Sequence, residues 1–426
     1  MPELRWSLCT RLAFRFGILA GALGVFPFPL GYIPKTQPIA NVLRAPLEWL
    51  TTELGAGLGM PDVKNLHNSS GDTTFDYVYL LLIAIVATLG TIAWSIVDRR
   101  RLAYPVLAAR ARVVLRYVVA YALISYGFVK LTRLQFPAAN PVRLDEPVGD
   151  MSPMGLLWTF MGGSGPYTVF AGFVEAFGGL LLLWRRTAFV GAVVVIAAMT
   201  NVVLLNFCYD VPVKLYSLQL LVMTIAIALP DARRVLAAAL GRATPDVPPR
   251  PRRSPRSERA RWIAKLLMCG AISWSVYNVI ARALGPDPGE QMAGFLGTWV
   301  VDSCTIDGDQ SPPLAVRWAR LMINPRSVQI VTLTGDRDWP TVKHDPVAHT
   351  LQVTLDEYVR DPPPKATTPA AKPVTELWTY ARPASDHLVI DGTHRGKSFH
   401  VAMHLVPPPP LVTRGFHWIN DVPYNW

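Results

Sequence analysis

Long apolar runs divide most of the chain into segments long enough to cross a lipid bilayer. A helix needs about 20 predominantly apolar residues to span the hydrocarbon core. Seven such windows occur, at about 11–32, 76–98, 112–134, 166–184, 187–207, 213–230 and 262–284. The fourth, fifth and sixth follow one another with short connections, which predicts a tight antiparallel bundle. The first run continues through GILAGALGVFPFPLGYIP without a small-residue cleavage site, so we expect it to remain as a span.

The pattern changes after the seventh run, where apolar and polar residues begin to alternate. This alternation predicts short strands at 296–305, 315–323, 327–334, 338–345, 348–355, 375–382, 386–392 and 397–405. Connections such as TGDRDW and DGTHRGK are typical of hairpins. Eight short strands in succession predict an up-and-down barrel or a sandwich.

The arginines orient the spans. They cluster before the first span, between the second and third, between the fourth and fifth, and after the sixth. If all these clusters face the cytoplasm, the N-terminus lies inside and the C-terminal domain outside. The composition, 51% hydrophobic and 17% charged, is that of a membrane protein. We therefore expect a bacterial cytoplasmic (inner) membrane protein with a periplasmic β-domain.

A basic stretch before the seventh span carries much of the net charge of +11, in the sequence GRATPDVPPRPRRSPRSERARWIAK. Its proline and arginine content is typical of a cytoplasmic linker that lies on anionic lipid head groups. Nucleic-acid binding is the alternative for such a run. We do not expect a nucleic-acid partner, because every other arginine cluster follows the same orientation rule. A second, amphipathic stretch, PLEWLTTELGAGLGM, lies in the first outer segment and is expected to lie along the surface of the membrane.

These patterns divide the chain into five parts. They are two N-terminal spans with an outer loop (1–109), a four-span bundle (110–235), the basic linker (236–261), the seventh span (262–284) and the β-domain (285–426).

Lys130 and Glu175 are the charged residues within the predicted spans that could serve a polar site. Lys130 lies near the outer end of the third span, and Glu175 lies near the middle of the fourth. A charge facing lipid at such depth costs a few kcal/mol. Lys130 either extends its ammonium to the membrane surface or serves a polar site. Glu175 is either a neutral, hydrogen-bonded structural residue or a functional one.

The segment NFCYDVPVK after the fifth span supplies candidate partners. Asp210 is at the right level to pair with Lys130. Glu175 is expected to lie deeper, so that a direct bond to Lys130 requires helix tilt or water. We expect one outward-facing cavity lined by Lys130, Glu175, Asn201, Asn206, Tyr209 and Asp210.

Asp72 and Asp76 precede and open the second span. Capping of that helix is one interpretation of this turn, and a position at the outer mouth of the cavity is the other.

Histidines and cysteines argue against several chemistries. None of the eight histidines lies in a predicted span, so a membrane haem held by paired histidines is not expected. No histidine cluster has metal-ligand spacing. The four cysteines form no C-x-x-C pair, so a dithiol redox centre is not expected either.

Two short motifs in the bundle carry a resemblance to a known family. Tyr126, Gly127 and Lys130 end the third span, and FVEAFGGLLLLWRR in the fourth contains Glu175 before a glycine pair. With these motifs, residues 110–235 resemble the DoxX family of bacterial membrane proteins. The resemblance implies a four-helix membrane bundle. Because the family takes its name from a subunit of a thiosulfate:quinone oxidoreductase, it also implies a quinone as ligand and a redox partner protein.

The β-domain opens with GFLGTWVVDS. Gly297, Thr298 and Trp299 resemble the G-x-W signature of lipocalin-like barrels, whose eight strands can enclose one small apolar ligand.

Three functions are consistent with these features. The first is a quinone-binding subunit or accessory of a membrane redox system. The second is a lipid or isoprenoid binding or transport protein that uses the membrane cavity and the outer barrel. The third is an envelope scaffold without catalysis.

Overall fold

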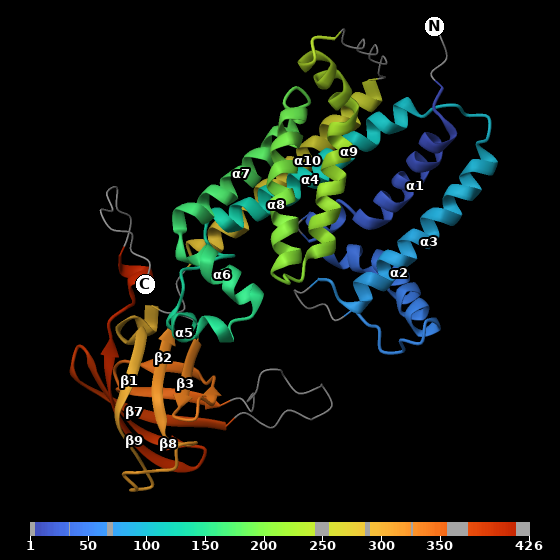
Figure 1. Ribbon diagram of the computed structural model, residues 1–426. Coiled ribbons are helices and arrows are strands. Elements are labelled where there is room, and N and C mark those ends of the chain that lie inside the picture. The colour runs from blue at the N-terminus through green and yellow to red at the C-terminus, as the bar shows by residue number, and fades with distance from the viewer. Residues whose placement is uncertain are drawn as a thin grey trace. The chain divides into compact units, whose positions relative to one another are not determined.

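Among the residues that the structure describes, seven helices are long and apolar enough to cross a membrane (Figure 1), as the hydropathy pattern predicted. They are α1 (Leu8–Val25), α3 (Thr74–Val97), α4 (Pro105–Leu131), α7 (Gly165–Leu183), α8 (Ala188–Cys208), α9 (Lys214–Ala239) and α10 (Pro255–Ala283). The protein is therefore a polytopic helical protein of the membrane type.

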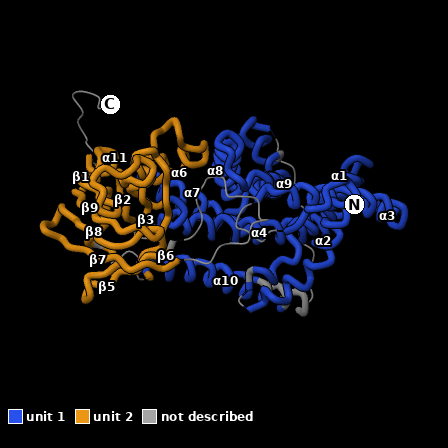
Figure 2. The backbone as a smooth tube through the Cα atoms, turned by 90° about the horizontal axis from the view of Figure 1, so that it is seen from below, with its two compact units in different colours: residues 1–136, 164–284 blue, residues 137–163, 285–426 orange. Residues whose placement is uncertain are grey.

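The computed structural model describes residues 5–33, 35–65, 71–242, 255–285, 290–324, 327–355 and 374–414. Residues 243–254, the middle of the expected basic linker, lie outside the described part. The chain forms two units (Figure 2). The helical unit comprises residues 1–136 and 164–284, and the β-unit comprises 137–163 and 285–426.

Four helices of the helical unit form a ring. Helix α4 packs against α7, α7 against α8, α8 against α9, and α9 against α4. The ring encloses a core of fully buried apolar side chains, among them Val119, Leu123, Leu182, Val195 and Ile227. Helix α10 packs on α4, and α1 pairs with α3. The ring thus contains the two helices that carry Lys130 and Glu175.

Helix α2 (Gln37–Gly57) follows the short 3-10 helix η1 (Leu30–Tyr32) and is amphipathic. Large apolar side chains are exposed at helical spacing along one face, namely Ile39, Val42, Leu43, Trp49 and Leu50. The expected amphipathic stretch is therefore a helix that begins earlier than the sequence pattern suggested.

The described residues of the β-unit form a curled antiparallel sheet of nine strands, a half-barrel (Figure 1). The strands are β1 (Gly297–Ile306), β2 (Trp318–Asn324), β3 (Ser327–Thr332), β4 (Arg337–Asp338), β5 (Thr341–Asp345), β6 (Thr350–Leu355), β7 (Val374–Ala384), β8 (His387–His394) and β9 (Lys397–Val406). The strand order is β4-β3-β2-β1-β9-β8-β7-β6-β5. All sequential neighbours except β4 and β5 pair with each other, and β1 pairs with β9. The order is therefore that of an up-and-down barrel left open between β4 and β5.

One predicted strand is divided in two. The sequence pattern suggested a single strand at 338–345, but β4 ends at Asp338 and β5 begins at Thr341. Pro340 lies between them and cannot donate a ladder hydrogen bond. The chain therefore passes at this proline from one edge strand of the sheet to the other.

Large aromatic side chains fill the concave side of the sheet. Trp299, Trp318 and Trp378 are at most 3% exposed, and Phe399 packs against the last two with ring centroids 4.8 and 5.0 Å away. The indole Nε1 of Trp299 donates to the carbonyl of Phe295, at the end of the 3-10 helix η3 (Glu290–Phe295), over 2.7 Å. The glycine-x-tryptophan motif is therefore part of a solid core.

The connection between α4 and α7 belongs to the β-unit, not to the bundle in which the sequence pattern placed it. It contains α5 (Pro141–Asp145), the 3-10 helix η2 (Val148–Asp150) and α6 (Pro153–Gly163). Helix α5 packs on β2, where Asp145 Oδ1 lies 2.5 Å from Arg320 Nη1. The short helix α11 (Pro410–Thr413) follows β9.

Contacts between distant segments agree with seven crossings. Residues 137–163 follow three spans and residues 285–426 follow seven, so both segments emerge on the same side and can form one unit. Arg112 in the N-terminal part of α4 and Asp231 in the C-terminal part of α9 form an ion pair, as expected for antiparallel spans. Which side is cytoplasmic remains the prediction made from the arginines.

Candidate functional site: a buried ion pair in the helical unit

Lys130 and Glu175 form a direct ion pair. The Lys130 Nζ lies 2.5 Å from Glu175 Oε1, and the residues are only 7% and 4% exposed. Lys130 is in the last turn of α4, whereas Glu175 is in the middle of α7. The lysine thus directs its ammonium into the bundle and not toward the membrane surface.

Glycines explain why the two helices approach closely enough for this pair. A Cβ atom added to Gly172 of α7 would lie 2.6 Å from the carbonyl oxygen of Gly127 on α4. A Cβ added to Gly179 would lie 2.9 Å from the side chain of Ile124. Backbone therefore packs against backbone, as small residues permit in membrane helices. This contact brings Lys130 to Glu175 without the bridging water that the sequence analysis considered.

The neighbouring Gly178 serves a different interface. A Cβ on Gly178 would lie 2.7 Å from Val195 of α8, and one on Gly191 would lie 3.0 Å from the carbonyl of Gly178. The glycine pair after Glu175 thus allows α7 to contact α4 through one residue and α8 through the other.

Asp210 does not supply the partner of Lys130. Its Oδ1 lies 2.7 Å from the Nζ of Lys214, and its side chain is 81% exposed. The expected Asp210–Lys130 pair is thus replaced by a local pair at the start of α9. The physical reason is proximity, since positions i and i+4 are near neighbours when a helix begins.

Asp72 and Asp76 act as helix caps. The two carboxylate oxygens of Asp72 accept hydrogen bonds from the backbone N–H groups of Lys214 (2.6 Å) and Leu215 (2.9 Å), which are the first residues of α9. Asp76 forms a capping box with Thr73 at the start of α3. Of the two interpretations of this turn, the contacts are those of capping, although Asp72 caps a helix distant in sequence.

The other expected members of the cluster all come from α8 or its end. Asn201 is exposed, and Tyr209 is the C-terminal cap residue of the helix. Asn206 is buried, and its Nδ2 has no hydrogen-bond partner among the described residues. Of the six residues expected to line one cavity, the described contacts therefore join only Lys130 and Glu175 to each other. Asn206 provides a buried amide donor on α8 without a described partner.

A second buried charge was not recognised from sequence. Arg15 of α1 is 2% exposed and donates to Tyr104 Oη, to Ser95 Oγ and to the carbonyl of Asp98. Tyr104 Oη in turn donates to Asp98 Oδ2 over 2.9 Å. This network ties α1 to the connection between α3 and α4. The signal in the sequence was Arg15 itself, a charged residue within the first apolar run.

The β-unit has its own polar cluster. Asp338 Oδ2 lies 3.2 Å from His394 Nε2, and its Oδ1 lies 2.8 Å from Arg395 Nη2. Burial by itself raises the pKa of Asp338, but the hydrogen bond with His394 and the charge of Arg395 outweigh burial and hold that pKa below its ordinary value. No group of three or more histidine, cysteine or acidic side chains suited to a metal ion occurs within the described ranges.

All four cysteines, Cys9, Cys208, Cys269 and Cys304, are free thiols. Burial raises the pKa of the Cys304 thiol, which keeps it protonated and unreactive in the β-unit core.

The fold and the ion pair define a class: a membrane-type helical protein with a buried lysine–glutamate pair and a curled β-unit. No family model matches the chain, and no solved structure matches it. The sequence is 34% identical over 121 residues to the uncharacterized protein YwoB of Bacillus subtilis (strain 168). The matched segment makes up 28% of this chain and 77% of YwoB. The chain therefore belongs, through that segment, to the same family as YwoB.

Proposed function

We propose that this is a DoxX-like membrane protein that binds a quinone head group at Lys130 and Glu175, as a subunit or accessory of a membrane redox system. The observation that carries the proposal is the ion pair, 2.5 Å long and almost fully buried between two apolar helices. Charges at such depth are costly, and in membrane proteins they mark ligand sites and proton pathways.

The side chains suit the chemistry of a quinone. Quinone carbonyl oxygens accept hydrogen bonds, and the Lys130 ammonium has three N–H donors. The buried Asn206 Nδ2 is a further donor without a described partner. Reduction of a quinone to a hydroquinone takes two electrons and two protons. A lysine–glutamate pair can hold and release protons, and a redox partner protein would supply the electrons.

Binding would be coupled to opening of the pair. A carbonyl oxygen that approaches Lys130 Nζ competes with Glu175 Oε1 for the same ammonium. The carboxylate released in this way becomes the group that exchanges a proton with the ligand. The structure would thus link the arrival of a head group to the protonation of Glu175.

The alternative of lipid or isoprenoid transport through the β-unit has less support. A barrel that holds a ligand needs interior space, whereas Trp299, Trp318 and Trp378 occupy the concave side of this sheet. We therefore base the proposed function on the helical unit.

The test is quinone content of the purified protein. Lipids and quinones extracted from the wild type are compared with those from Glu175→Gln, from Lys130→Met and from the double variant that carries both changes. Each variant is checked for folding by circular dichroism. We expect quinone enriched over the bulk membrane ratio in the wild type, and enrichment lost in all three variants.

A double variant that folds and retains its quinone would refute the proposal. A wild type without enrichment would do so too and would favour the envelope-scaffold interpretation.

A further inference from the structure

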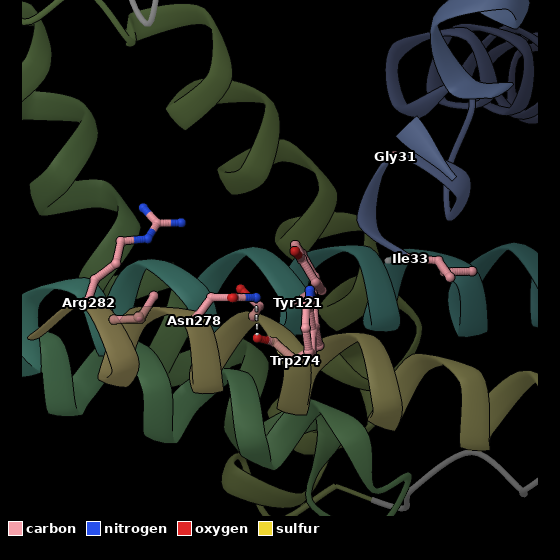
Figure 3. A pocket seen from close by; sticks show the side chains of 8 residues that line it. Gly31, Ile33, Tyr121, Trp274, Asn278 and Arg282 are labelled. Carbon is pink, nitrogen blue, oxygen red and sulfur yellow. Dashed lines mark hydrogen bonds between the residues drawn. The ribbon is translucent and has the colours of Figure 1, made fainter. Parts of the chain in front are cut away.

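A separate groove lies in the helical unit between α10, α4 and the η1 segment (Figure 3). Its volume is about 240 Å³. Helix α10 contributes Ser275, Asn278 and Arg282, α4 contributes Tyr121, and Gly31 comes from η1. Most known ligand pockets are larger, about 300–1,000 Å³. The space therefore suits a head group and not a whole amphiphile.

The polar residues of α10 form one stripe. Ser275, Asn278 and Arg282 are spaced i, i+3 and i+7, which places them on one face of the helix. Ser275 Oγ is 2.8 Å from Ser125 Oγ, which ties this face to α4. Asn278 Nδ2 donates to the Trp274 carbonyl over 2.8 Å. The stripe thus runs along the groove and ends at a guanidinium.

Arg282 is the cation of this groove. It lies in the last turn of α10, is exposed, and makes no ion pair with any described residue. Figure 3 shows it at one end, with Asn278 next along α10 and with Tyr121 and Trp274 beyond. A cation at a span end, followed by hydrogen-bonding groups and then by aromatic rings, matches the order of groups in a membrane lipid.

The groove is not part of the Lys130–Glu175 site. Tyr121 and Lys130 are nine positions apart on α4, and about 100° per residue places them on opposite faces of the helix. A ligand in the groove therefore contacts α10 and η1, whereas the ion pair faces α7.

We propose that this groove binds the phosphate of an anionic membrane phospholipid. The Arg282 guanidinium pairs with the phosphate oxygens through parallel hydrogen bonds, the geometry in which arginine exceeds lysine. Asn278 contacts the glycerol region, and Tyr121 and Trp274 lie beside the ester groups.

The experiment uses the full-length protein, purified and delipidated in a non-ionic detergent. Melting temperature is measured during separate titrations with phosphatidylglycerol, phosphatidylcholine and inorganic phosphate, because a ligand that binds the folded state stabilises it. We expect phosphatidylglycerol to raise the melting temperature at concentrations at least tenfold lower than the other two.

Arg282→Gln should weaken the phosphatidylglycerol response at least tenfold, and Arg282→Lys should weaken it less. The matched control is Arg100→Gln, which removes an exposed arginine outside the groove and should respond as the wild type does.

Three results would overturn the inference. Equal responses to phosphatidylglycerol and phosphatidylcholine would show that the charge is not recognised. An equal response to inorganic phosphate would assign the groove to a free anion. Equal responses of Arg282→Gln and Arg100→Gln would show that Arg282 does not bind the lipid. None of these results bears on quinone content, so the inference can fail independently of the proposed function.

Discussion

Removing one member of the Lys130–Glu175 pair should destabilise the protein far more than removing both. At the observed separation of 2.5 Å, Coulomb's law with an effective dielectric constant of about 20 gives an attraction of about 7 kcal/mol. Desolvation of each buried ion costs several kcal/mol, so the net contribution of the pair is small. A single substitution leaves one buried charge without a partner, which costs about 3–5 kcal/mol.

We therefore expect Lys130→Met and Glu175→Gln each to lower the unfolding free energy by about 3–5 kcal/mol, and the double variant to lower it by about 1 kcal/mol or less. The assay is unfolding by SDS in mixed micelles, followed by circular dichroism, for all four members of the cycle. The coupling energy should be several kcal/mol. Single effects that simply add in the double variant would refute a buried, mutually compensating pair.

Three further outcomes follow from the described contacts. Gly172→Ala places a Cβ 2.6 Å from a carbonyl oxygen of α4 and should cost about 1–3 kcal/mol in the same assay; Gly270→Ala, which meets no atom within 4 Å, is the control and should cost nothing. Asp145→Asn removes the partner of Arg320 and should speed proteolytic cleavage within the α4–α7 connection, whereas unchanged cleavage would show that this ion pair does not hold the connection. Because the pKa of Asp338 is lowered, its carboxylate stabilises the folded state at pH values above the ordinary pKa of 3.8, and this stabilisation is lost as pH falls through the folded pKa. The difference in melting temperature between wild type and Asp338→Asn should therefore shrink below about pH 4. A difference that stays constant with pH would show that the Asp338 carboxylate does not stabilise the folded state in this way.

Hydropathy and alternation were sufficient to predict the seven spans and most of the strands. The seven spans were predicted within a few residues at most ends, because length and apolar content are local properties. The β-strands were predicted for the same reason, and the exception was local too. Pro340 interrupts the strand expected at 338–345, and the missing N–H of a proline was available in the sequence.

The geometry of the candidate site was harder to predict from the sequence. Lys130 and Glu175 were recognised as costly charges, but counting residues from the span ends placed them at different depths. The distance between them depends on the crossing of α4 and α7, which the contact of Gly127 with Gly172 determines. A sequence shows that glycines are present but not which helix each of them faces. Asp210 was assigned to Lys130 for the same reason, since depth alone does not reveal the nearer Lys214.

The capture of residues 137–163 by the β-unit has a consequence for biosynthesis. Asp145 precedes its partner Arg320 by 175 residues. At a synthesis rate of about 5–20 residues per second, Asp145 is synthesised roughly 9–35 s before Arg320. During this interval the connection has already been synthesised, whereas the strands that will bind it do not yet exist. The proline and acidic residues of PAANPVRLDEPVGD keep this segment soluble and disfavour its pairing with other chains until the strands have been synthesised.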